Sequence, residues 1–139
     1  MLCFASQASE SQGESQVIRW IERATLHANT GGDSELAVEV LDIFAGQVET
    51  WGQMLDAKSD PERWADAAHT LKGAALGIGA VQLADACKLA EEAGRSEPPP
   101  SLTRAALLLN DIRDVLMPTL EEVAKVRHEL SVSGIFRAS

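Results

Sequence analysis

The chain has 139 residues, of which 45% are apolar and only 4% aromatic, and its formal net charge is −9. This length is enough for one domain with a hydrophobic core. The low aromatic content, with no tyrosine, favours a helical bundle over a sheet protein. The acidity argues against nucleic-acid binding, which requires a basic face.

The same composition bears on location. No segment approaches the roughly 18 apolar residues that cross a membrane. The N-terminus lacks the basic and apolar runs of a secretory signal. Cys87 falls on an apolar helix face and is expected to be a buried thiol in a reducing compartment, whereas Cys3 lies in a loose tail. A structural disulfide between them is not expected. We therefore expect a cytoplasmic protein that does not bind membranes.

The N-terminal part of the chain predicts a tail and one short helix. Residues 1–14 are rich in Ser, Gln and Glu, which is typical of disorder. The run Asn29-Thr30-Gly31-Gly32 is a strong helix breaker and should end the helix that follows the tail. The apolar face of this short helix is expected to consist of Val17, Ile18, Ile21 and either Ala24 or Leu26.

Two longer helices follow. Asp33 or Ser34 can cap a second helix, which should run to about Ala57. Ser59-Asp60-Pro61 separates it from a third helix, because proline is tolerated in a first helical turn. The third helix carries Trp64 through about Leu76, before a turn made by Gly77, Ile78 and Gly79. The apolar stripe of the second helix is Leu36 or Ala37, Val40 or Leu41, Phe44, Val48, Trp51 and Leu55.

A fourth helix is expected from about Ala80 to Ala93, burying Leu83, Ala84, Cys87 and Ala90. Gly94 ends it, and Pro98-Pro99-Pro100 makes a stiff connection. Ser101 then caps a last helix, which Pro118 either kinks or ends. The apolar stripe of that helix is Leu102, Ala105, Leu109, Ile112, Leu116, Leu120 and Val123.

These elements predict an all-α fold, an up-down four-helix bundle with an additional short N-terminal helix. The bundle should comprise residues 15–127. Residues 128–139 fit no periodic template and are expected to fray.

His69 lies on the third helix, and a helical wheel predicts which way it faces. A helix turns about 100° per residue, so that His69 lies about 140°, Lys72 about 80° and Gly73 about 180° from Trp64. Positions three and four apart are neighbours on a helix, so these three residues form one exposed group, the His69 patch. The opposite, buried stripe within roughly 40° of Trp64 contains Ala68, Leu71, Ala75 and Ile78.

The composition of the His69 patch suits a histidine that accepts a phosphoryl group. Such a histidine must be exposed, and a nearby lysine offsets the phosphoryl charge. Gly73 costs about 1 kcal/mol relative to alanine inside a helix, and close approach of another protein would explain it. The alternative is an ordinary solvated histidine. A metal site is not expected, because neither His27 nor His128 has a second ligand beside it.

The segment Ala68-His69-Thr70-Leu71-Lys72-Gly73-Ala74-Ala75, followed by Ile78-Gly79-Ala80 and then Leu83, Cys87 and Glu91, resembles the histidine-containing phosphotransfer (HPt) domain. The resemblance covers roughly residues 30 to 95. It implies that His69 exchanges a phosphoryl group with the aspartate of a response-regulator receiver domain, in a relay that includes a sensor or hybrid histidine kinase. It also implies that Lys72 assists the phosphoryl group and that Gly73 leaves room for docking.

The same resemblance gives Glu91 a role. Glu91 stands where some relatives have a glutamine that orients the histidine. Either Glu91 orients His69, or it forms a solvated (i, i+4) pair with Arg95; the sequence leaves both open. No cofactor is expected in this chain, and Mg²⁺ is expected on the receiver partner. The surface that docks partners is expected around the patch, at Ala65, Leu76, Gly77, Lys88 and Arg95.

The sequence shows no nucleotide-binding motif, so we expect a monomeric phosphoryl carrier rather than an enzyme. One alternative is the dimerising phosphoacceptor part of a sensor histidine kinase. There, an acidic residue follows the histidine and a proline comes a few positions later, whereas this chain has Thr70 and Ala74. The other alternative is a non-catalytic helical interaction module.

Overall fold

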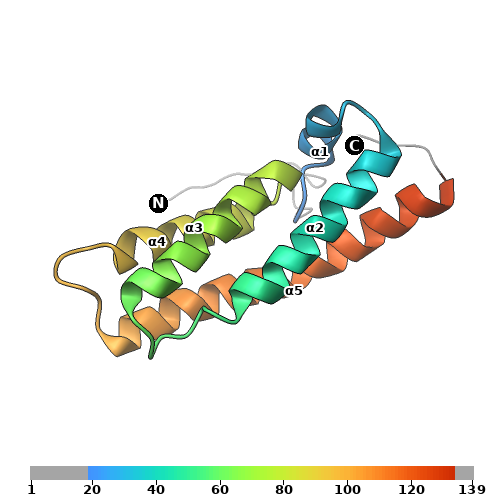
Figure 1. Cartoon of the computed structure of the whole chain (residues 1–139). Helices are drawn as coiled ribbons and strands as arrows, with labels where there is room; N and C mark the ends of the chain where they lie inside the picture. The colour runs from blue at the N-terminus through green and yellow to red at the C-terminus, as the bar shows by residue number, and fades with distance from the viewer. Residues whose placement is uncertain (1–18, 134–139) are drawn as a thin grey trace, which may run out of the picture.

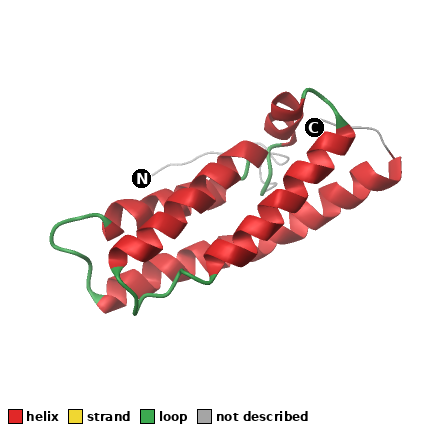
Figure 2. Ribbon diagram, in the orientation of Figure 1, coloured by secondary structure: helices red, strands yellow, loops and turns green. Residues whose placement is uncertain are grey.

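The computed structural model describes residues 19–133. All regular elements in this range are helices (Figure 2). Helices α2 to α5 run alternately up and down the long axis of one bundle, and the short helix α1 lies at the end where α2 begins (Figure 1). The predicted all-α, up-down architecture is therefore confirmed. The helices are α1 (Arg23–Thr30), α2 (Ser34–Gly52), α3 (Pro61–Ile78), α4 (Val81–Gly94) and α5 (Leu102–Ser133).

Side-chain caps start three of the long helices where the sequence predicts them. The Asp33 carboxylate accepts two backbone N–H bonds at the start of α2. Asp60 accepts one at the start of α3, where Pro61 occupies the first turn. The Ser101 hydroxyl accepts one at the start of α5. Each cap satisfies N–H groups that have no partner within the helix.

The short N-terminal helix begins later than predicted, at Arg23, and continues to Gly31, which ends it in the left-handed region at φ 63°. Ile21 is buried although it precedes the helix. The Glu22 N–H donates to the Gly79 carbonyl at 2.8 Å, which holds this segment against the end of α3. Of the predicted apolar face, Ile21 and Leu26 are buried, Ala24 is exposed, and Val17 and Ile18 lie outside the described residues.

α2 ends at Gly52, five residues before the predicted end at Ala57. The chain turns there, and Leu55 is buried in the core from the connecting loop rather than from a helix. Arg113 of α5 donates a hydrogen bond to the Leu55 carbonyl. The predicted stripe position was right for Leu55, but its burial does not require a helical backbone.

The turn between α3 and α4 is tighter than predicted. Gly77 and Ile78 belong to α3, and the helix ends at Gly79, with φ 79°. A Cβ at Gly79 would lie 2.6 Å from the Glu22 carbonyl oxygen. Glycine is needed at this position both for the backbone conformation and for the close approach of the segment before α1.

α5 continues through Pro118, so the alternative that the helix ends there is wrong. Leu116 and Val123, on either side of the proline, are both buried, so packing on one face holds the helix together across the missing N–H. Leu102 is exposed, because it is the first residue of the helix at the end of the bundle. The predicted fraying from 128 is wrong for 128–133, where Leu130 is buried; residues 134–139 lie outside the described range.

α4 lies very close to α3 near its C-terminal end. A Cβ at Gly94 would lie 2.8 Å from Trp64 Cζ3 and 2.9 Å from Ala65 Cβ. Carbon atoms in ordinary contact are about 3.5–4.0 Å apart. The absence of a side chain at Gly94 therefore allows the last turn of α4 to pack directly on the first turns of α3.

Candidate functional site

The orientation of α3 agrees with the helical wheel. Trp64, the origin of the predicted stripe, is fully buried, and so are the other members of the stripe: Ala68, Leu71, Ala75 and Ile78. His69 points away from this core, with 61% of its side chain exposed. Gly73, one turn further on, is also exposed, and a Cβ there would meet no atom within 4 Å. The predicted exposed histidine with a low neighbouring surface is present.

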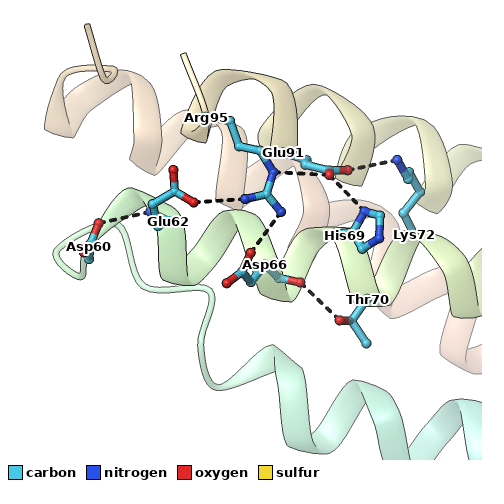
Figure 3. Close-up of polar contacts among 8 residues, drawn as sticks. All are labelled: Asp60, Glu62, Asp66, His69, Thr70, Lys72, Glu91 and Arg95. Carbon is cyan, nitrogen blue, oxygen red and sulfur yellow. Dashed lines mark hydrogen bonds and ion pairs between the residues drawn. The ribbon is translucent and has the colours of Figure 1, made fainter. Parts of the chain in front are cut away.

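Glu91 of α4 reaches across to α3 and joins two members of the His69 patch (Figure 3). Its Oε2 lies 2.9 Å from His69 Nδ1, and its Oε1 lies 2.9 Å from Lys72 Nζ. The Glu91 side chain is only 15% exposed. Each carboxylate oxygen thus has its own charged or polar partner, as a largely buried carboxylate requires.

Lys72 is less exposed than the wheel suggests, since only 26% of its side chain is accessible. Its ammonium group does not extend into solvent beside His69 but turns toward Glu91. A lysine on a four-carbon stem is flexible, so this ammonium group can exchange Glu91 for another acceptor.

Glu91 makes both of the contacts that the sequence left open, one to His69 and one to Arg95. Besides contacting His69, Glu91 Oε2 lies 3.4 Å from Arg95 Nε, the (i, i+4) pair. Arg95 also donates to Glu62 at 3.0 Å and to Asp66 at 2.9 Å, both on α3. The bonds to α3 show that Arg95 is not a free cation beside the site.

Glu62 and Asp66 were not predicted as site residues from the sequence, although the helical wheel places both on the face that carries His69. Relative to Trp64 they lie at about 160° and 200°, on the same face as His69 at about 140°. A wheel of α3 cannot show that Arg95 bonds these two carboxylates, because Arg95 follows another helix, α4. The acidic residues before His69 are therefore part of the same polar cluster.

The surroundings shift the pKa values of Glu91 and Cys87. Burial raises the pKa of Glu91, but the hydrogen bonds from Lys72 and His69 outweigh it and leave the pKa below its ordinary value. Glu91 is therefore ionised near neutral pH and can only accept hydrogen bonds. Cys87, one helical turn before Glu91, is completely buried, and burial raises the pKa of its thiol to about 12. Cys87 is thus a buried thiol, as predicted, and is not a nucleophile.

Of the residues predicted to dock a partner, Ala65 is wrongly assigned. It is completely buried, because the Gly94 backbone covers it. Leu76 is 53% exposed and Lys88 is exposed. Gly77 is half-buried, and its carbonyl accepts a hydrogen bond from Asn29 Nδ2 at 2.9 Å.

Two further findings concern residues 19–133. Residues 19–133 contain no group of three or more His, Cys, Asp or Glu side chains arranged to hold a metal ion. Within the same residues, no helix combines the length and apolar character that crossing a membrane requires.

Comparisons with known proteins show what the chain is similar to. A family model described as the Hpt domain matches residues 34–129, which include α2 to α4 and most of α5. Among solved structures, the chain is similar to the histidine phosphotransferase ShpA from Caulobacter crescentus, with 31% sequence identity and a TM-score of 0.66. That match covers 84% of this chain and 98% of the other. A search of curated proteins found no match.

Proposed function

The chain belongs to the Hpt domain family, whose members transfer phosphoryl groups in two-component phosphorelays, and we propose that it carries the phosphoryl group on Nε2 of His69. The observation that supports this most directly is the hydrogen bond between His69 Nδ1 and Glu91. It engages one ring nitrogen within the protein. The other nitrogen, Nε2, makes no hydrogen bond to any described residue and belongs to a largely exposed ring.

Glu91 also determines which nitrogen is nucleophilic. An ionised carboxylate only accepts hydrogen bonds, so the neutral imidazole must carry its proton on Nδ1. The lone pair is then on Nε2, the exposed atom. Nε2 attacks the phosphorus atom of an aspartyl phosphate on the partner; the Nε2–P bond forms as the P–O bond to the aspartate breaks, and the aspartate leaves with the electron pair.

The product ring carries both the Nδ1 proton and the phosphoryl group, so it is a cation. Glu91 balances this charge at 2.9 Å, and no proton has to leave for the transfer to occur. In the reverse reaction the ring departs as a neutral imidazole, which is a far better leaving group than an imidazolate. Transfer in either direction therefore benefits from a proton kept on Nδ1.

Lys72 and Gly73 have complementary roles in this proposal. The Lys72 ammonium group turns from Glu91 to a phosphoryl oxygen when the negative charge arrives, as a flexible point charge can. Gly73 leaves the surface beside His69 low, so that the loops around the partner's aspartate can reach Nε2. The exposed side chains of Leu76 and Lys88, with the half-buried Gly77, extend this docking surface.

The partners follow from the same chemistry. A receiver domain supplies the phosphorylated aspartate and its Mg²⁺, and a sensor or hybrid histidine kinase supplies the phosphoryl group to the relay. The chain itself acts as a cytoplasmic carrier with no cofactor of its own, and as a monomer. Light scattering during size exclusion tests the monomer against a dimerising kinase segment.

The central test is phosphorylation by a phosphorylated receiver domain, followed by intact-protein mass spectrometry. The wild type should gain the mass of one acid-labile phosphoryl group. His69→Gln should gain none, while His128→Gln, which changes an exposed histidine on α5, should behave as wild type. If His69→Gln accepts the phosphoryl group as well as wild type does, the assignment of His69 is wrong.

A further inference from the structure

Arg95 stands immediately after α4 and bonds to three carboxylates (Figure 3). Its two terminal nitrogens lie 3.0 Å from Glu62 Oε1 and 2.9 Å from Asp66 Oδ1, both on α3. Its Nε lies 3.4 Å from Glu91 Oε2. That oxygen is the same one that contacts His69 Nδ1. A single guanidinium group thus connects the carboxylate behind His69 to the first turns of the helix that carries His69.

The backbone explains how Arg95 can reach α3. Gly94 packs against Trp64 and Ala65 so closely that a Cβ would lie under 3.0 Å from both. The residue after Gly94 is therefore held directly above the first turns of α3, where Glu62 and Asp66 lie. The planar fork of an arginine can bond several carboxylates at once, which a lysine ammonium cannot do with the same geometry.

We propose that Arg95 is a positioning residue for phosphoryl transfer, which holds Glu91 in place against His69 instead of contacting the partner protein. This rests on the proposed function of His69. Without Arg95, Glu91 keeps only Lys72 as a charged anchor, and Lys72 is the side chain that turns toward the phosphoryl group. Arg95 therefore supplies the bond to Glu91 that remains when Lys72 leaves.

The ion pairs of Arg95 with Glu62 and Asp66 are too exposed to make Arg95 mainly a stabilising residue. The side chain of Arg95 is 37% exposed, and those of Glu62 and Asp66 are 65% exposed. Ion pairs with this exposure add little to folding stability. Removal of Arg95 should therefore leave the bundle folded and affect mainly the alignment of Glu91 and His69.

The test is a double-mutant cycle of Arg95→Ala and Glu91→Gln, with single-turnover phosphoryl transfer from a phosphorylated receiver domain. Arg95→Ala should slow transfer about two- to fivefold at saturating receiver, as expected for loss of one partly exposed ion pair. In the Glu91→Gln background the same change should have no further effect, because Arg95 acts through Glu91. Arg127→Ala is the matched control, since Arg127 bonds Asp42 across α5 and α2 in the same way, away from the His69 patch.

A second measurement needs no phosphorylation. The ¹⁵N NMR shifts of His69 Nδ1 and Nε2 report which nitrogen carries the proton, and Arg95→Ala should move them toward those of Glu91→Gln. If Arg95→Ala does not fold, Arg95→Lys replaces it in this measurement. Lysine keeps the positive charge but not the planar fork, so Arg95→Lys should move the His69 shifts in the same direction.

Three results would overturn the proposal. The first is equal slowing by Arg95→Ala in the wild-type and Glu91→Gln backgrounds. The second is an effect only on the receiver concentration needed for half-maximal rate, which would make Arg95 a docking residue. The third is a His69 spectrum unchanged by loss of Arg95. If instead no variant, wild type included, is phosphorylated at His69, the proposed function fails, while the NMR spectra still decide whether Arg95 positions Glu91.

Discussion

Gly73→Ala should stabilise the protein and slow its reaction. An added Cβ at this exposed position on α3 would meet no atom within 4 Å, so the substitution has no steric cost inside the molecule. Alanine is favoured over glycine within a helix by about 0.8–1 kcal/mol. We expect the free energy of unfolding to rise by about 0.5–1 kcal/mol, and Tm by about 2–4 °C for a chain of this size.

The same methyl group should hinder docking. It stands four residues after His69, on the face that a partner must approach, and one methyl group in a well-packed contact costs about 1–2 kcal/mol, or roughly tenfold in rate. The assays are urea unfolding followed by circular dichroism, and single-turnover transfer from a phosphorylated receiver domain. Gly46→Ala in α2, where a Cβ also meets nothing within 4 Å, is the control for stability. Transfer at the wild-type rate would refute the reasoning that glycine is present to admit a partner, and a loss of stability would refute the packing argument.

Two further predictions concern the contact between α3 and α4. Glu91→Gln should lower the free energy of unfolding by about 1 kcal/mol at pH 7, because an amide has one acceptor oxygen where the carboxylate offers two. Since the pKa of Glu91 is lowered by folding, its contribution is present above the unfolded-state pKa of about 4.3 and is lost as the pH falls through the folded-state pKa. Urea unfolding from pH 7 to pH 3 should thus show the difference between wild type and variant shrinking; a difference that is constant over this range would contradict the ionised carboxylate. Gly94→Ala should lower stability by about 1–2 kcal/mol despite its better helix propensity, because its Cβ would lie 2.8 Å from Trp64 Cζ3 and 2.9 Å from Ala65 Cβ. A Tm at or above that of the wild type would show that the two helices can separate at no cost.

Several features of the chain could be predicted from local sequence, because they depend on interactions between residues a few positions apart. The caps at Asp33, Asp60 and Ser101 are of this kind. So is the direction in which His69 points, since the helical period places it opposite the buried stripe of α3. Helix ends were predicted less well where an apolar residue is buried from a loop, because its place in the periodic pattern then suggests a longer helix than the chain forms. Leu55 is buried from a loop, and α2 stops before it.

Sequence alone therefore determined the all-α bundle and an exposed His69 with Lys72 and Gly73 beside it, because a helix's period is a local property. The approach of α4 to α3 is not local, and only the tertiary structure decided what depends on it. Gly94 packs against Ala65, a residue that was expected to dock a partner and that is completely buried. The packing of α4 on α3 also brings Glu91 next to His69 and Lys72. It places the Arg95 guanidinium group against Asp66. A contact to His69 and a pair with Arg95 are not alternatives in the folded chain, because one carboxylate oxygen of Glu91 lies within reach of both side chains.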